Sequence, residues 1–413
     1  MLRKAGIAAV SVLVLTGAGC SDGKGTGAMG GSTGSGGATG AGGTTGGAGT
    51  TGAGGDGSAA GSSGGGGATG AAGTSGAAGD GGAAGSSGTA GASGAAGATG
   101  AAGRGGATGA GGAAGASGAT PREEAIADLL RLRQEHGVAA LRGEIYVVVG
   151  YAMNPSPTVE AYNPTTRMWR SVAAFPFNAQ HPNVGVARDR IIVAGFYVES
   201  GTGNPNAGVY AYNPDADRWD AVASLPTGTE RAAACTAVLN DKLYVFGGGR
   251  RGMSVADASV YDPMTDMWTK LPDMPARKEH CAAGAIGGKI YIAGGRADSI
   301  TGFEPSAFVF DPANGSYTPR KQLPVARGGC ASAVLRDKLY VFGGEGNAAT
   351  AAGVFPNIDE YDPATDTWRA LPPMVMPRHG FNAAVVGDRI YLPGGASRQG
   401  GGAVTYGSVF YFP

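Results

Sequence analysis

The chain has 413 residues, of which 80 are glycine, and its 31 basic side chains balance 31 acidic ones. Because there is no net charge and no run of lysine or arginine, the sequence lacks the basic surface that binds nucleic acid, so no nucleic-acid partner is expected. The glycines are concentrated before residue 120, which indicates a long low-complexity segment in front of one large domain.

Residues 1–19 have the pattern of an export signal. Two basic residues, Arg3 and Lys4, precede an apolar run that ends at Leu15, and this run is shorter than the about 20 residues that span a membrane. The small residues before Cys20 resemble a bacterial lipobox, which implies that Cys20 carries a lipid and begins the mature chain. Ordinary signal cleavage, with Cys20 incidental, is the alternative. We therefore expect an exported protein of the bacterial cell envelope, in the outer membrane or on the cell surface, that contacts the membrane only through this anchor.

Residues 20–120 consist almost entirely of glycine, alanine, serine and threonine. Such a segment has almost no bulky apolar side chain to bury, so nothing offsets the conformational entropy lost on ordering it. We expect a disordered tether, and about 100 residues of this kind have an r.m.s. reach of ~55 Å. The folded domain is therefore expected at residues 121–413.

This domain contains six copies of an internal repeat. The octapeptide DKLYVFGG stands at 241–248 and again at 337–344, and related sequences stand at 144–150, 190–195, 289–295 and 389–395. An aromatic residue two positions before a proline follows each copy, and the first five repeats have a further aromatic residue seven positions later: Trp169, Trp219, Trp268, Tyr317 and Trp368. Each period accommodates four short strands, and four strands repeated every ~40–50 residues indicate a β-propeller.

The Gly-Gly, Tyr-Asp-Pro and Trp landmarks over residues 133–413 resemble those of kelch repeats. The resemblance implies an all-β, six-bladed kelch-type β-propeller, preceded here by the Gly/Ala/Ser/Thr-rich linker. The tryptophans recur on the expected outer strands, where packing between blades is favoured over stacking on a ligand.

The sixth repeat reaches only its third-strand landmark at residues 411–413. In kelch proteins a strand from the N-terminal side fills the missing place, and matching RQEH at 133–136 with RKEH at 277–280 assigns this role to residues 121–132. The rival is a short helix, because residues 120–123 (TPRE) form a capping-box pattern. Strand closure is expected, since an unpaired blade edge is the costlier defect.

The loops that join second to third strands ring one opening of the central channel, and this loop face is the expected binding face. The candidate residues on it are Arg133, His136, His181, Arg231, Arg277, His280, Arg327, Glu345, Arg378 and His379. The five arginines recur at the same place in their repeats, so they either tie blades together or bind a carboxylate or sugar acid.

The histidines precede first strands, and His379, His136 and His181 belong to contiguous blades. Imidazoles suit Zn or Cu, but no short spacing such as HExxH is present, so hydrogen bonds to backbone carbonyls are favoured and no metal or cofactor is expected. Glu345 follows a Gly-Gly landmark at the lip of the channel. It is interpreted either as an acid–base group or as a salt-bridge partner.

Three cysteines remain in the domain. Cys281 and Cys330 occupy matching first-strand positions in adjacent blades, and Cys235 lies one place out of register. Equivalent positions on neighbouring inner strands are expected to exceed the ~7 Å Cα separation that a disulfide tolerates. We therefore expect inert, buried side chains and no complete disulfide framework.

The function expected from these features is non-catalytic binding of an envelope protein or a glycan through the loop face. The alternative is a carbohydrate-active enzyme. Sialic acid mutarotases are six-bladed and exported, but their Lys-Pro-Gly-x-Arg run is missing after Glu345, where residues 346–349 read GNAA. Copper galactose oxidases resemble this chain only in the repeat. A scaffold that pairs with a partner in a larger complex is a third hypothesis.

Overall fold

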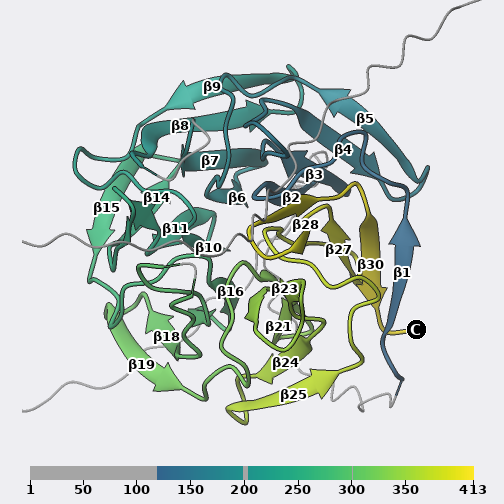
Figure 1. Ribbon diagram of the computed structural model, residues 1–413. Coiled ribbons are helices and arrows are strands. Elements are labelled where there is room, and N and C mark those ends of the chain that lie inside the picture. The colour runs from purple at the N-terminus through teal and green to yellow at the C-terminus, as the bar shows by residue number, and fades with distance from the viewer. Residues whose placement is uncertain (1–118, 199–202, 300) are drawn as a thin grey trace, which may run out of the picture. The chain divides into compact units, whose positions relative to one another are not determined.

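The computed structural model describes residues 119–198, 203–299 and 301–413. The export signal, Cys20 and nearly all of the expected linker lie outside these residues. Within them all regular elements are β-strands, and six antiparallel four-stranded sheets form the blades of a propeller (Figure 1). The predicted all-β, six-bladed propeller is confirmed. No helix in the described segments is long and apolar enough to cross a membrane.

In blades 1 to 5 the strands run outward from the channel in chain order. Blade 1 comprises β2 (Gly137–Leu141), β3 (Glu144–Val148), β4 (Val159–Asn163) and β5 (Met168–Val172). Blade 2 comprises β6 (Val184–Ala187), β7 (Arg190–Phe196), β8 (Asn206–Asn213) and β9 (Arg218–Val222). Blade 3 comprises β10 (Cys235–Leu239), β11 (Lys242–Phe246), β14 (Ala258–Asp262) and β15 (Met267–Leu271).

Blade 4 comprises β16 (Ala282–Ile286), β17 (Lys289–Ala293), β18 (Ala307–Asp311) and β19 (Ser316–Arg320). Blade 5 comprises β20 (Ala331–Leu335), β21 (Lys338–Phe342), β24 (Ile358–Asp362) and β25 (Thr367–Leu371). Blade 6 comprises β26 (Ala384–Val386), β27 (Arg389–Pro393), β30 (Gly407–Tyr411) and, as its outer strand, β1 (Arg122–Ile126). Three loops carry small hairpins: β12 (Gly249–Arg250) with β13 (Met253–Ser254), β22 (Glu345–Asn347) with β23 (Gly353–Val354), and β28 (Ala396–Arg398) with β29 (Gly401–Ala403).

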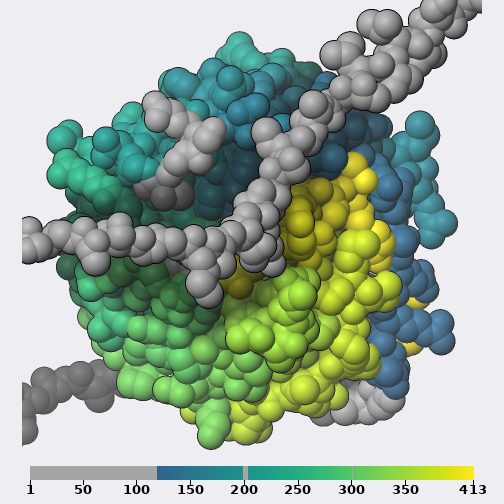
Figure 2. Space-filling model, in the orientation of Figure 1, coloured from purple at the N-terminus to yellow at the C-terminus, as the bar shows by residue number. Residues whose placement is uncertain are grey.

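The sixth blade is completed by the segment that precedes blade 1. β1 pairs antiparallel with β30, from Arg122 opposite Tyr411 to Ile126 opposite Gly407, and Figure 2 shows this blue segment against the yellow sixth blade. Beyond the strand, the N–H of Leu129 donates to the carbonyl of Thr405 at 2.9 Å. Within the expected segment 121–132, residues 122–126 thus close the ring as a strand, and the capping-box pattern is overridden because β30 offers a row of backbone partners.

Backbone conformation and close contacts explain why glycine occupies the Gly-Gly landmark. At Gly248 φ is 110°, and a Cβ there would lie 2.7 Å from the carbonyl oxygen of Ala232. A Cβ at Gly247 would lie 2.1 Å from the carbonyl oxygen of Lys278 in the next blade, to which the N–H of Gly248 donates at 2.9 Å. In this blade, glycine avoids a clash with the backbone of its own and the next blade, which explains why the octapeptide ends as it does.

The tryptophans pack between blades, as the repeat pattern predicts. The indole N–H of Trp169, Trp219, Trp268 and Trp368 donates to a backbone carbonyl of the preceding blade at 2.8 to 3.1 Å. For Trp169 that carbonyl belongs to Ala127, just after β1. The closing strand is therefore tied to blade 1 by the contact that joins other neighbouring blades.

The expectation for the cysteines is wrong in part. Cys235 and Cys281 form a disulfide between blades 3 and 4, with a Cα–Cα distance of 5.3 Å. Inner strands converge on the axis, and the one-residue offset of Cys235 brings the two sulfur atoms together rather than apart. Cys330 is a free, buried thiol among the described residues, and burial raises its pKa to about 11.

Candidate functional site

A ring of backbone hydrogen bonds surrounds the central channel just before the first strands. One residue per blade, which we call the ring position, has a positive φ of 49 to 64°. Its N–H donates to the carbonyl of the ring position in the preceding blade at 2.6 to 3.0 Å, and the bond from Glu135 to Gly380 closes the circle. The six ring positions are Glu135, His181, Ala233, His280, Gly329 and Gly380.

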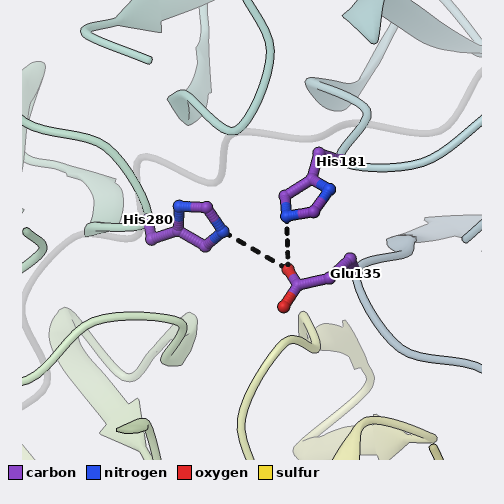
Figure 3. Close-up of side chains that lie close together, drawn as sticks. All are labelled: Glu135, His181 and His280. Carbon is purple, nitrogen blue, oxygen red and sulfur yellow. Dashed lines mark ion pairs between the residues drawn. The ribbon is translucent and has the colours of Figure 1, made fainter. Parts of the chain in front are cut away.

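Three ring-position side chains meet on the channel axis, and we call them the channel cluster: Glu135, His181 and His280 (Figure 3). Oε2 of Glu135 lies 3.3 Å from Nε2 of His181 and 3.4 Å from Nε2 of His280. The three side chains are only 10%, 7% and 5% exposed. One carboxylate and two imidazoles form a donor set suited to a transition metal.

A charged layer lies beside the channel cluster toward the loop face. Arg296 forms ion pairs with Glu279, at 2.9 Å, and with Glu345. His379 Nε2 lies 3.3 Å from Oε2 of Glu345 and 3.8 Å from Oε1 of Glu135. The N–H of Gly400 also donates to Glu345 at 3.2 Å. Glu345 therefore has polar partners on both oxygens, including the Arg296 guanidinium, which corresponds to the salt-bridge interpretation.

Burial and neighbouring charges shift the pKa values of the three channel-cluster side chains in different directions. Burial lowers the pKa of His181 to about 4, although Glu135 opposes the shift. For His280, burial and Arg296 lower the pKa, but Glu279 and Glu135 outweigh them and raise it to about 9. Burial disfavours the charge on Glu135, yet the surrounding histidines hold its pKa well below its usual range. Without a ligand at neutral pH, His181 is neutral, His280 is a cation and Glu135 is an anion.

The recurring arginines lie inside the blades. Arg231, Arg327 and Arg378 are 0% exposed and Arg133 is 2% exposed. Arg133 pairs with Glu160 and Arg327 pairs with Asp359, while Arg378 donates to the carbonyls of residues 392, 394 and 406. These guanidiniums fasten loops to blade backbones and present no free group on the loop face.

Arg277 does not occupy the arginine position of blade 4. Its side chain is 56% exposed and pairs with Asp298, whereas Lys278 is fully buried and donates to the carbonyls of Gly294 and Ser306 at 3.1 Å. Matching RQEH with RKEH was therefore one residue out of register. The correct match places Glu135 at the same position as His280.

The histidine trio considered from the sequence does not assemble. His136 is 1% exposed and its Nε2 lies 3.0 Å from the carbonyl oxygen of Pro393, although the residue borders the same cavity as the channel cluster. His379 borders the cluster through Glu345 and Glu135. Sequence reasoning missed Glu135, although counting back equally from Gly150 and Gly295 would have aligned it with His280.

Comparison with known proteins agrees with the repeat architecture. A family described as the KLHDC2/KLHL20/DRC7 Kelch-repeats domain matches residues 180–395, and the Kelch motif matches residues 132–176. The chain belongs to the kelch-repeat family. The chain is 34% identical over 282 residues to Kelch-like protein terF of Aspergillus terreus, a match covering 64% of this chain and 61% of the relative. Kelch-like protein 35 of Mus musculus is 27% identical over 172 residues, or 41% and 28% of the two chains.

A protein of solved structure shares the fold. The structure of YjhT matches with a TM-score of 0.58 at 16% identity, covering 69% of this chain and 96% of that one. This likeness concerns the fold alone. The kelch-repeat chain described here spans less than two thirds of the length of the two curated relatives named above.

Proposed function

We propose that this kelch propeller is a non-catalytic binding module that recognises a protein partner through its loop face, and that it is exported and held in the bacterial envelope by a lipid on Cys20. The fold supports the first part, because a kelch propeller is compatible with protein binding. The export-type sequence of residues 1–19 and the lipobox-like residues before Cys20 support the second.

An apolar groove on the loop face carries the proposal. It has a volume of about 440 Å³ and lies between the segment after β1 and the loop after β3, with Leu130, Leu132 and Tyr151 among its lining residues. Leu130 and Leu132 are 55% and 50% exposed, and Met153 in the adjoining loop is 89% exposed. Exposed apolar side chains around a preformed groove are typical of a protein-binding site.

The backbone around the groove is fixed. The N–H of Leu130 donates to Oε2 of Glu160 at 2.9 Å, and the N–H of Arg133 donates to the carbonyl of Val404 at 3.3 Å. Leu130 and Leu132 are thus presented by an ordered segment, so less backbone entropy is lost on binding. A mostly apolar lining favours an apolar or aromatic side chain of a protein over a polyhydroxylated glycan.

Site-specific photo-crosslinking in envelope preparations tests this function. A photoreactive amino acid replaces Met153 on the loop face or, as the matched control, Met264, which is 68% exposed in a turn on the opposite face. We expect a discrete protein adduct from position 153, absent from position 264 and lost when Leu130→Glu and Leu132→Glu are added. Equal labelling from both positions, or labelling unaffected by the leucine changes, would contradict the proposal.

A further inference from the structure

We propose that the channel cluster, Glu135, His181 and His280, binds one divalent transition-metal ion on the axis of the propeller. This inference goes beyond the protein-binding function and does not depend on it. The three ligands come from blades 1, 2 and 4, and the ring of backbone hydrogen bonds holds all three at equivalent places around the channel.

The spacing of the donor atoms fits a tetrahedral ion. Ligands about 2.0–2.1 Å from Zn²⁺ are about 3.3–3.4 Å from one another in a tetrahedron. Oε2 of Glu135 lies 3.3 and 3.4 Å from the two Nε2 atoms, and all three ligand atoms lie within 4.8 Å of one another. The two imidazole nitrogens also lie within 4.8 Å of each other, and rotation of either ring about its side-chain bonds adjusts this separation.

The Nδ1 atom of each imidazole lies beside a side-chain oxygen, which orients the Nε2 atom of the same ring toward the ion. His181 Nδ1 lies 3.1 Å from Oε1 of Gln180, and in the tautomer whose Nδ1–H donates to that oxygen, Nε2 carries a lone pair that faces the Glu135 carboxylate. Two lone pairs pointing at each other repel unless a cation lies between them. His280 Nδ1 lies 3.5 Å from Oε1 of Glu279. Amide and carboxylate oxygens beside the outer nitrogen are the usual support of metal-ligating histidines.

The local charge also favours a dication. Three carboxylates lie in or beside the channel cluster, those of Glu135, Glu279 and Glu345, and Arg296 is the guanidinium among them. When the imidazoles are neutral, these four groups together carry two net negative charges. Nη2 of Arg296 lies 3.5 Å from His280 Nε2, but this guanidinium is engaged by Glu279 and Glu345. Glu135 therefore remains as the carboxylate for the ion.

The channel has room for the ion and its fourth ligand. The remaining ring positions are Ala233, Gly329 and Gly380, so half of the circle bears little or no side chain. A cavity of about 50 Å³ lies against the ring, and this volume accommodates a few water molecules. Three protein ligands with one open position occupied by water is the arrangement of an accessible zinc site rather than of a closed structural one.

Metal binding to the full-length protein tests the proposal. Protein stripped with a chelator is titrated with Zn²⁺ by calorimetry, and bound zinc is counted by mass spectrometry after dialysis. We expect one Zn²⁺ per chain, and an affinity at least about 100-fold lower in His181→Asn and His280→Asn. Asparagine is chosen because it tolerates the positive φ of the ring position. His379→Asn is the matched control, since this histidine borders the cluster without being a ligand, and it retains the wild-type stoichiometry.

A second measurement covers the case in which a histidine variant misfolds. Glu135→Gln keeps the shape of the side chain but removes its charge, so we expect Zn²⁺ to raise the melting temperature of the wild-type protein and not that of this variant. Failure of the folded wild-type protein to bind Zn²⁺ or Co²⁺ at micromolar concentrations would overturn the proposal. Wild-type affinity in the two histidine variants, or loss of binding in His379→Asn equal to theirs, would overturn it as well.

Discussion

Breaking the Cys235–Cys281 disulfide measures how far the link between blades 3 and 4 stabilises the ring. The bridge closes a loop with a sequence separation of 46 residues. In the chain-entropy description, a loop of this length removes about 4 kcal/mol of conformational freedom from the unfolded chain at 25 °C, which is an upper estimate of the stabilisation. We therefore expect the double variant Cys235→Ser/Cys281→Ser to lose about 2–4 kcal/mol in the free energy of unfolding.

The assay is urea unfolding followed by tryptophan fluorescence, with and without a reducing agent. Reductant should lower the unfolding midpoint of the wild-type protein toward that of the double variant and leave the double variant unchanged. Cys330→Ala serves as the control, because Cys330 is buried but unpaired, and its midpoint should still respond to reductant. A double variant as stable as the wild type, or a wild type insensitive to reductant, would refute the reasoning.

Two further substitutions test contacts that recur with the blades, one within a blade and one between blades. Gly248→Ala should lower the free energy of unfolding by more than about 2 kcal/mol, because φ is 110° there and the new Cβ would clash with backbone of its own blade. Gly252→Ala, at φ 75° with no atom within 4 Å of its Cβ, should cost only about 1 kcal/mol of backbone strain, and equal losses for both in chemical denaturation would show that the clash is unimportant. Trp268→Phe removes the 2.8 Å hydrogen bond to the carbonyl of Ala223 and should cost about 1–2 kcal/mol, so an unchanged thermal midpoint would contradict its role between blades.

The blade count followed directly from the sequence because each landmark has a local cause. Gly247 and Gly248 recur where neighbouring backbones approach, and Trp268 recurs where an indole reaches the previous blade. Because each blade needs these residues at the same places, the spacing of the landmarks along the sequence gives the number of blades. The place of β1 followed from the incomplete sixth repeat.

The channel cluster was harder to predict because it depends on how the six repeats align and close. A one-residue error that matched Arg133 with Arg277 instead of Lys278 moved Glu135 away from His280. The distance between Cys235 and Cys281 likewise reflects how closely inner strands converge on the axis. No local pattern reports that convergence, so the site and the disulfide emerged only from the assembled ring.

The closing pairing of β1 with β30 underlies the ring and hence the channel cluster, and a crosslink tests it most directly. Arg122 lies opposite Tyr411 in the paired strands, and facing residues lie within the Cα separation that a disulfide accepts. Arg122→Cys combined with Tyr411→Cys should therefore form a disulfide, detected in tryptic peptides by mass spectrometry. Arg122→Cys combined with Phe412→Cys should not, since adjacent side chains in a strand point to opposite faces. A crosslink in the second pair and none in the first would contradict the closure described here.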